Sequence, residues 1–183
     1  MEMNIENALE IARKFGDFED REGLGWLATA ASQHRLIAEV GSCVGRTARA
    51  MADNTTGEVY CIDTWEGTAS EADFMEQIRN HPPGWLRQSF DENVRGLANV
   101  HPVQASSQSA AEFLKEMCFD MIFIDADHSY ESVKADILAW RPLLAEGGLL
   151  CGHDYHPSFP GVIQAVNELI PAFSVSGVIW RAL

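Results

Sequence analysis

Short runs of apolar residues alternate with amphipathic segments along most of this chain. Apolar runs bounded by glycine, proline or polar residues are typical of buried strands. The sequence therefore predicts strands over five segments: 35–41, 58–65, 99–106, 119–125 and 147–154. Apolar residues at helical spacing predict helices between and around the strands, over 5–15, 22–33, 46–53, 109–117, 129–144 and 161–169.

The alternation of strands and helices determines the predicted fold. Strands joined by helices form parallel βαβ units, and helices cover both faces of the resulting sheet. Residues 173–183 can add a hairpin or two short edge strands. We expect a single α/β domain over residues 1–183, with a Rossmann-like, open and mostly parallel seven-stranded sheet that carries an antiparallel C-terminal strand.

One segment, residues 66–93, interrupts this alternation. It is longer than an ordinary connection between a strand and a helix. It contains Pro82, Pro83, Trp85 and Phe90, which a flexible linker would not. We interpret this insert as a lid or a substrate-recognition segment.

The charge of the chain limits its partners. Acidic residues outnumber basic ones by 27 to 13, and the formal net charge is −14. Such a field repels phosphate backbones, so we expect no nucleic-acid partner. No apolar stretch approaches the ~20 residues that span a bilayer, and the first residues lack the apolar region of a signal peptide. We expect a cytoplasmic protein with no membrane partner, and the sequence leaves a homodimer open.

Four cysteines stand at positions 43, 61, 118 and 151. Their spacing contains no CxxC motif and indicates neither a zinc ribbon nor a thioredoxin-type pair. All four lie in or beside apolar segments, so we expect buried, reduced thiols.

The stretch AEVGSCVGRT joins a predicted strand to a predicted helix and contains Gly41 and Gly45. Glycines at such a turn let the backbone bend sharply and a ligand approach closely, although tight packing alone can also require them. Asp63 ends the next strand, where an acid can accept hydrogen bonds from the ribose hydroxyls of an adenosine cofactor. The stretch lacks the GxG of dinucleotide-binding turns, and Glu39 would place negative charge near a pyrophosphate. Both features favour a cationic ligand, such as a sulfonium that also carries an amino group.

Polar residues also follow two later strands: Asp125 ends one apolar run, and His153 and Asp154 end the next. The carboxyl ends of parallel strands meet at one edge of a sheet, so these carboxylates can converge there. A carboxylate at the end of an apolar strand requires a cation, and a divalent metal or a sulfonium would serve. His128 is the candidate general base, because imidazole accepts a proton near pH 7. Asp127 is expected to cap a helix or face solvent.

These stretches resemble a known family. EVGSCVGRT resembles motif I of class I S-adenosylmethionine (SAM)-dependent methyltransferases, in the ExGxxxGxS/T form of metal-dependent O-methyltransferases. Residues 119–155 are similar to a small, methyltransferase domain 24-like group with macrolide-sugar and cephalosporin-biosynthesis relatives. The resemblance extends over roughly residues 22–183, and it matches neither the insert nor the first helix.

The resemblance implies which residues bind the cofactor. Asp63 would bind the ribose, and Asp125 would lie at the methionyl amine and the metal. Trp65, beside the adenosine, is a candidate for stacking, with packing as an equal alternative. The full set implied for the cofactor is Glu39, Gly41, Ser42, Gly45, Thr47, Asp63, Thr64, Trp65, Ser107, Gln108 and Asp125.

The metal set is predicted as Asp125, Asp154 and His153. The related enzymes usually have an acidic or uncharged residue at the position of His153. Magnesium prefers oxygen ligands, whereas imidazole suits manganese and later transition metals better. The sequence therefore leaves the metal open, with magnesium or manganese as the expected ion.

Together these features predict a SAM-dependent O-methyltransferase that acts on a hydroxyl group of a sugar or small metabolite. Asp125 and His128 would be its catalytic residues, with a metal assisting. Two alternatives stay open: a nicotinamide-dependent oxidoreductase, which the missing GxG disfavours, and a catalytically inactive cofactor-binding or interaction module. The identity of the acceptor stays open as well.

Overall fold

The computed structural model of this protein describes residues 3–16, 19–68 and 70–183. In these residues the apolar runs form strands and the amphipathic segments form helices, as the sequence pattern predicts. The strands are β1 (Leu36–Val40), β2 (Glu58–Asp63), β3 (Val100–Gln104), β4 (Phe119–Ile124), β5 (Leu144–Gly152), β6 (Phe173–Ser176) and β7 (Ile179–Ala182). The helices are α1 (Glu6–Phe15), α2 (Arg21–Ala31), α3 (Arg46–Ala52), α4 (Ala72–Arg79), α5 (Trp85–Asn93), α6 (Ser107–Phe113), α7 (Tyr130–Trp140), the 3-10 helix η1 (Arg141–Leu143) and α8 (Pro160–Leu169).

The seven strands of the described residues form one sheet in the order β3-β2-β1-β4-β5-β7-β6. Strands from β3 to β5 run parallel, whereas β7 pairs antiparallel with both β5 and β6. The predicted Rossmann-like sheet is therefore confirmed. Val40 pairs with both Ile62 and Ile124, and Ile124 pairs with Gly152. The carboxyl ends of β1, β2, β4 and β5 consequently lie at one edge, where such sheets bind ligands.

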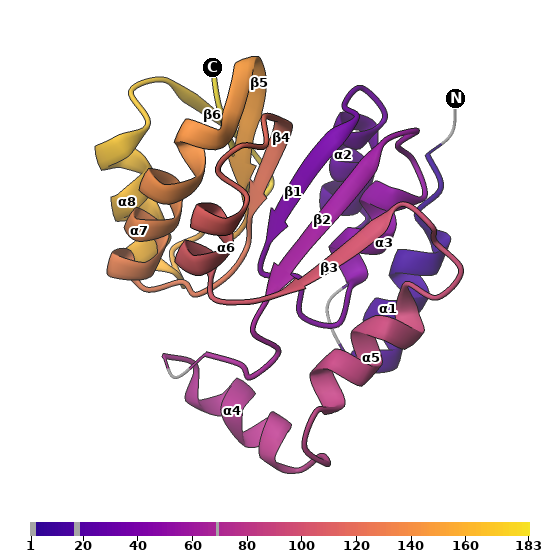
Figure 1. The fold of residues 1–183 in the computed structure, drawn as a ribbon. Helices are drawn as coiled ribbons and strands as arrows, with labels where there is room; N and C mark the ends of the chain where they lie inside the picture. Colours follow the sequence, from indigo (N-terminus) through magenta and orange to yellow (C-terminus); the bar gives the residue numbers. More distant parts are fainter. Residues whose placement is uncertain (1–2, 17–18, 69) are drawn as a thin grey trace.

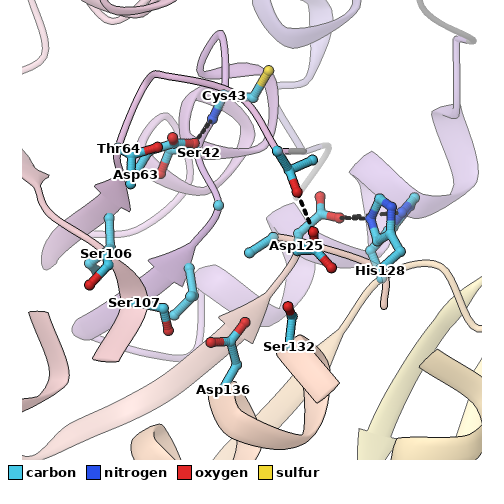
Figure 2. Close-up of a pocket in the computed structure, with 18 of the residues that line it drawn as sticks. Ser42, Cys43, Asp63, Thr64, Ser106, Ser107, Asp125, His128, Ser132 and Asp136 are labelled. Atoms are coloured by element: carbon cyan, nitrogen blue, oxygen red, sulfur yellow. Dashed lines mark hydrogen bonds and ion pairs between the residues drawn. The ribbon is translucent and has the colours of Figure 1, made fainter. Parts of the chain in front are cut away.

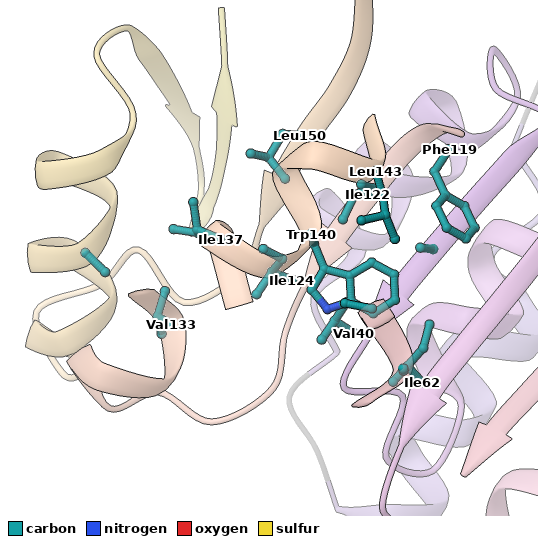
Figure 3. Close-up of a cluster of buried hydrophobic side chains, with 14 of the residues drawn as sticks. Val40, Ile62, Phe119, Ile122, Ile124, Val133, Ile137, Trp140, Leu143 and Leu150 are labelled. Carbon is teal, nitrogen blue, oxygen red and sulfur yellow. The ribbon is translucent and has the colours of Figure 1, made fainter. Parts of the chain in front are cut away.

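Helices cover both faces of the sheet (Figure 1). One apolar cluster packs α6, α7 and α8 on one face, and another packs α1, α2, α3 and α5 on the other. Side chains of β4 alternate between the two: Ile122 and Ile124 belong to the first cluster, Met121 and Phe123 to the second. Trp140 is fully buried at the centre of the first cluster (Figure 3).

The predicted helix over 129–144 ends earlier than expected. α7 ends at Trp140, and η1 follows with Pro142 among its residues. Proline cannot donate a hydrogen bond to the preceding turn, and its ring clashes with the carbonyl four residues earlier. β5 begins at Leu144, three residues before the predicted start of that strand at residue 147, where it pairs with Phe119.

The insert at residues 66–93 forms two helices with different environments. α5 is anchored, because Leu86 and Phe90 are buried in the cluster that also contains α3. α4 has no buried residue. It lies beyond the carboxyl ends of β1 and β2 (Figure 1), beside the edge at which a ligand would enter.

The four cysteines differ in exposure. Cys61 and Cys151 are buried and Cys43 is half-buried, but Cys118 is exposed, so the expectation of four buried thiols is wrong. Cys118 lies in the connection before β4, outside both apolar clusters. As for membrane contact, none of the helices within the described ranges has the length and hydropathy needed to cross a bilayer.

Candidate active site

A cavity of about 440 Å³ opens at the carboxyl edge of the sheet. The loops that follow β1 to β5 line it, together with the start of the insert. Figure 2 shows Asp63, with Ser42 and Cys43, at one end of this cavity and Asp125 with His128 at the other. The volume lies within the range of small-molecule sites, which is about 300–1,000 Å³.

The turn after β1 requires glycine for a reason beyond ligand approach. Gly41 has φ +95°, a backbone conformation that favours glycine. A Cβ at this position would lie 2.1 Å from the backbone oxygen of Asp125, so no side chain fits between the ends of β1 and β4. Gly45 has φ +84° and is the N-cap residue of α3. Gly41 therefore lets the two strand ends approach each other as well as opening the turn.

The carboxylate of Asp63 is held by two backbone groups. The N–H of Cys43 donates to Oδ2 and the N–H of Trp65 donates to Oδ1, both at 2.7 Å. These bonds fix the side chain between the turn after β1 and the end of β2. Each carboxylate oxygen keeps further acceptor capacity. Asp63 can therefore accept hydrogen bonds from a diol in the cavity, as the sequence predicts for a ribose.

Glu39 lies beneath the cavity and does not line it. Its side chain is fully buried, and neither carboxylate oxygen makes a well-oriented hydrogen bond to a described residue. Burial raises the pKa of Glu39 to about 7, and the nearby hydroxyls of Ser42 and Thr47 limit this rise. Glu39 was predicted to border the ligand, but the turn that follows β1 separates its side chain from the cavity.

A polar recess lies at the end of the cavity formed by α6 and α7, where Ser107, Gln108 and Asp136 line the wall. Gln108 Nε2 donates to Asp136 Oδ1, and Trp140 Nε1 donates to Ser107 Oγ, both at 2.9 Å. Burial raises the pKa of Asp136 to about 6, and its hydrogen bonds with Ser107 and Gln108 oppose the rise. Oriented polar groups therefore surround Ser107 and Gln108, two of the residues that the resemblance implies for the cofactor.

Three residues predicted for the acceptor side converge at the other end of the cavity. His128 Nε2 is 2.8 Å from Asp154 Oδ2 and 3.9 Å from Asp125 Oδ1. Within the described ranges, Asp125, His128 and Asp154 are the one group whose ligand atoms all lie within 4.8 Å of one another. Two carboxylate oxygens and an imidazole nitrogen are a donor set that can hold a divalent ion.

His153, predicted as a metal ligand, lies beside this group and is not part of it. Its Nδ1 is 3.2 Å from Asp154 Oδ2 and 3.8 Å from Asp125 Oδ1. Its Nε2 is 3.8 Å from Asp20 Oδ2, on the residue that caps α2. His153 is therefore shared between the carboxylates and the start of α2, and His128 supplies the nitrogen that completes the cluster.

The carboxylates keep both histidines protonated at neutral pH. Burial lowers the pKa of His128, but Asp125, Asp154 and Glu71 outweigh it and raise the pKa to about 12. Burial also lowers the pKa of His153, and the charges of Asp125 and Asp154 raise it to about 10. Burial raises the pKa of Asp154, but the two imidazoles hold it well below its usual range. This end of the cavity is a network of paired charges.

The start of the insert contacts this network. Glu71, the N-cap residue of α4, places Oε1 2.8 Å from His128 Nδ1. The hydroxyls of Thr68 and Ser70 both donate to Asp127 Oδ2. The other oxygen of Asp127 accepts from a backbone N–H at the start of α7, at 2.8 Å. Asp127 therefore holds the loop before α7, whose N-cap residue is Ser129, and also anchors the insert.

Most of the predicted site residues line the cavity, but three do not: Glu39, Gly45 and Trp65. Gly45 lies behind the turn, where a Cβ would meet the Phe90 ring at 3.0 Å. The Trp65 ring is buried 5.0 Å from the Phe90 ring, and its indole N–H donates to the carbonyl of Cys43 at 2.8 Å. Trp65 therefore supports the turn, and its ring faces no ligand here. The predicted residues that do line the cavity are Gly41, Ser42, Thr47, Asp63, Thr64, Ser107, Gln108, Asp125, His128, His153 and Asp154.

The cavity also contains polar residues that the sequence analysis did not identify, among them Arg46, Thr68, Glu71 and Asp136. Thr68 and Glu71 belong to the insert, whose position over the sheet no local pattern indicates. Asp136 had a usable signal, because it is an acid on the otherwise apolar face of the α7 pattern. Arg46 follows the glycine turn directly, where a side chain at the helix start faces the strand ends.

Tyr130 and Lys134 have the Tyr-x-x-x-Lys spacing used by one class of nicotinamide-dependent oxidoreductases. Their polar ends meet Glu168 on α8: the Tyr130 hydroxyl donates to it at 2.5 Å, and Lys134 Nζ donates to it at 2.7 Å. Neither residue lines the cavity. The pair is therefore a surface contact between α7 and α8 and gives the oxidoreductase alternative no support.

Backbone strain gathers around the cavity. Three described non-glycine residues have positive φ: Cys43 at 44°, Trp65 at 55° and Asp154 at 60°. All three lie within three residues after the end of a strand at the carboxyl edge. Such conformations are uncommon for residues with a Cβ and concentrate at functional sites.

Comparisons with known proteins agree with this geometry. A family model described as "Methyltransferase domain" matches residues 38–155. The solved structure of the calicheamicin methyltransferase CalS11 is similar with a TM-score of 0.67 and 14% identity, over 97% of this chain and 91% of that chain. The O-methyltransferase from Bacillus cereus, solved in complex with SAH, has a TM-score of 0.65 and 17% identity, over 98% and 90% of the two chains.

A further relative is a protein of Sinorhizobium fredii with the name "Uncharacterized protein y4gI". It is 24% identical over 135 residues, which are 70% of this chain but 14% of that protein. The chain therefore spans only a small part of that relative. The similarity to the solved structures supports the Rossmann-like fold. The match to the family model supports a methyltransferase activity.

Proposed function

The chain belongs to the methyltransferase-domain family, and we propose that it transfers the methyl group of SAM to a hydroxyl oxygen of a sugar or another small metabolite. The observation that supports this proposal is that one cavity contains both a group suited to binding the cofactor and a cluster suited to activating the acceptor. A fixed carboxylate, Asp63, lies at one end, and the Asp125, His128 and Asp154 cluster lies at the other. A methyl transfer requires such a pairing, because donor and acceptor must meet in line.

The cofactor end of the cavity suits an adenosine ligand. SAM, when bound, supplies a methyl group on a positively charged sulfur, and the acceptor oxygen displaces that sulfur. Asp63, oriented by two backbone N–H groups, would accept from the ribose hydroxyls. Gln108 and Asp136 present polar atoms in the recess beyond it, where an adenine edge would lie. Gly41 leaves the backbone of the turn open to the cofactor.

The acceptor end suits a divalent ion. Asp125 and Asp154 are only 15% and 16% exposed at their side chains, and both carboxylates face the same imidazole. Two carboxylates that converge in this way would hold magnesium or manganese, since both ions accept oxygen ligands. Such an ion would polarise the acceptor hydroxyl and make its proton easier to remove.

His128 is the residue placed to accept that proton, through Nε2. Asp125 and Asp154 now hold a proton on the imidazole, and the base must be free of it to act. When these carboxylates bind a cation, they raise the pKa of His128 less, and the imidazole can release its proton. The ability of His128 to accept a proton would therefore depend on whether a cation is bound by Asp125 and Asp154.

The acidic lining also limits the acceptor. Glu71, Asp125, Asp127 and Asp154 all border this end of the cavity. These four carboxylates outnumber the imidazolium groups of His128 and His153, so an anionic acceptor group, such as a phosphate ester, would be repelled while no metal ion is bound. We therefore favour an uncharged hydroxyl compound as the acceptor, and a neutral sugar meets this condition.

The first experiment is calorimetric titration with S-adenosylhomocysteine (SAH), in chelator and then with added magnesium or manganese. Micromolar binding is the expected result, since SAH lacks only the transferable methyl group. An absence of binding under every condition would refute the proposal.

The second experiment measures SAH release from SAM with a panel of sugar and phenolic acceptors. His128→Ala should bind SAH as the wild-type protein does but release none during turnover, because the proton acceptor is gone. His101→Ala is the matched control, since His101 is a partly exposed histidine on β3 outside the cavity. Equal turnover by His128→Ala would remove His128 as the base.

A further inference from the structure

The insert brings a carboxylate to the catalytic histidine. Glu71 Oε1 lies 2.8 Å from His128 Nδ1, and that oxygen is buried with no hydrogen-bond partner among the described residues. The contact is short, although the two groups are not aligned as a hydrogen bond. Catalytic contacts are often misaligned before the substrate complex forms. Glu71 therefore forms an ion pair with His128, the proposed base.

The imidazole of His128 is held from three sides. Glu71 faces Nδ1 and Asp154 faces Nε2, each at 2.8 Å. The Phe159 ring packs beside the imidazole, with ring centroids 4.5 Å apart. Because each nitrogen faces a different carboxylate, the ring cannot turn over without losing both contacts. This arrangement assigns Nε2, and not Nδ1, to the acceptor end of the cavity.

Anchoring contacts keep Glu71 in this position. Thr68 and Ser70, just before it, both donate to Asp127 on the loop that carries His128. Gly67 has φ +80°, and a Cβ there would lie 2.5 Å from a side-chain carbon of Ile78 on α4. The start of the insert is thus bonded to the catalytic loop on one side and packed against α4 on the other.

We propose that Glu71 is a positioning residue, whose carboxylate holds Nδ1 of His128 so that Nε2 faces the acceptor. The catalytic consequence rests on the proposed function, whereas the contact itself can be tested without an acceptor. Partners that orient a histidine are usually worth about 10- to 100-fold in activity. Glu71 would make the base depend on a segment that lies outside the parallel βαβ core.

The test compares wild-type protein with Glu71→Ala, Glu71→Gln and Glu76→Gln at neutral pH, each with and without SAH. Glu76 is an exposed glutamate on the same helix and is the matched control for a change of charge. The measured quantities are the ¹⁵N chemical shifts of the His128 ring, assigned with His128→Ala, and the hydrogen exchange of α4. Melting temperatures show whether each variant is folded.

Glu71→Ala should shift both His128 ring nitrogens and increase exchange in α4. Glu71→Gln should shift the nitrogens less, because its amide oxygen can still accept from Nδ1. Glu76→Gln should give the wild-type spectrum. With an acceptor in hand, Glu71→Ala should lower kcat by about 10- to 100-fold while the KM for SAM changes little.

Unchanged His128 nitrogens in a folded Glu71→Ala protein would overturn the inference. This outcome is separable from failure of the proposed function. If the wild-type protein does not bind SAH, the methyltransferase proposal fails, and the spectra of the ligand-free proteins still decide whether Glu71 positions His128.

Discussion

Replacing Glu39 with glutamine should stabilise the ligand-free protein more at alkaline pH than at acidic pH. Glu39 is fully buried beneath the glycine turn, and burial raises its pKa from 4.5 to about 7. A carboxyl group with a raised pKa in the folded state favours folding while it is protonated. Its contribution is therefore complete below pH 4.5 and is lost as the pH rises through about 7.

The size of the effect follows from these two pKa values. Ionisation of Glu39 should lower the free energy of unfolding by about 1 kcal/mol at pH 5 and by about 3 kcal/mol at pH 8. The glutamine cannot ionise, so the stability difference between variant and wild type should change by about 2 kcal/mol between these pH values. Other titrating groups, such as Asp136, contribute to both proteins alike and cancel in the difference.

Urea unfolding of both proteins at pH 5 and pH 8, analysed by linear extrapolation, measures this difference. Glu10→Gln, on the exposed side of α1, is the control and should show no such dependence on pH. A Glu39→Gln difference that is the same at both pH values would refute the reasoning. It would mean that Ser42, Thr47 and the turn above Glu39 stabilise the carboxylate as well as water does.

Other predictions concern the ligand contacts. Asp63→Ala should weaken SAH binding by about 1.5–3 kcal/mol in calorimetry, because a charged acceptor is lost; equal affinity would mean that the ribose is held elsewhere. Gly41→Ala should lower the melting temperature and abolish SAH binding, since its Cβ would lie 2.1 Å from Asp125, whereas Gly25→Ala, whose Cβ meets nothing within 4 Å, should do neither. Asp154→Asn should weaken manganese binding followed by electron paramagnetic resonance, and unchanged manganese affinity would exclude Asp154 as a ligand.

The fold could be predicted where its signal is local. The apolar run at 119–125 corresponds to β4 within one residue, and helices between strands imply parallel pairing. The start of β5 was misplaced because it depends on a distant strand. Leu144 pairs with Phe119, with a register shift before the next pair of Met121 and Leu149, and nothing near Leu144 in the sequence indicates that partner.

The site could be predicted where parallel strands end, because the sheet brings those ends together. Asp63, Asp125 and Asp154 were found in this way, and all three line the cavity. Side-chain direction was harder to predict. Glu39 follows the strand alternation and points to the α3 face, beneath the turn. Trp65 turns inward to Phe90, a contact with the insert that has no signature in the sequence.

The two ends of the cavity differ in how the chain builds them. At the cofactor end, backbone groups do most of the positioning, through the conformation of Gly41 and the N–H groups that hold Asp63. Such backbone geometry requires particular residues at fixed spacing, so a short sequence motif identifies this end of the cavity. At the acceptor end, His128 is held by Glu71, a residue of the insert 57 positions earlier in the chain. A change in the insert can therefore alter the acceptor and its activation while the motifs that identify the family stay intact.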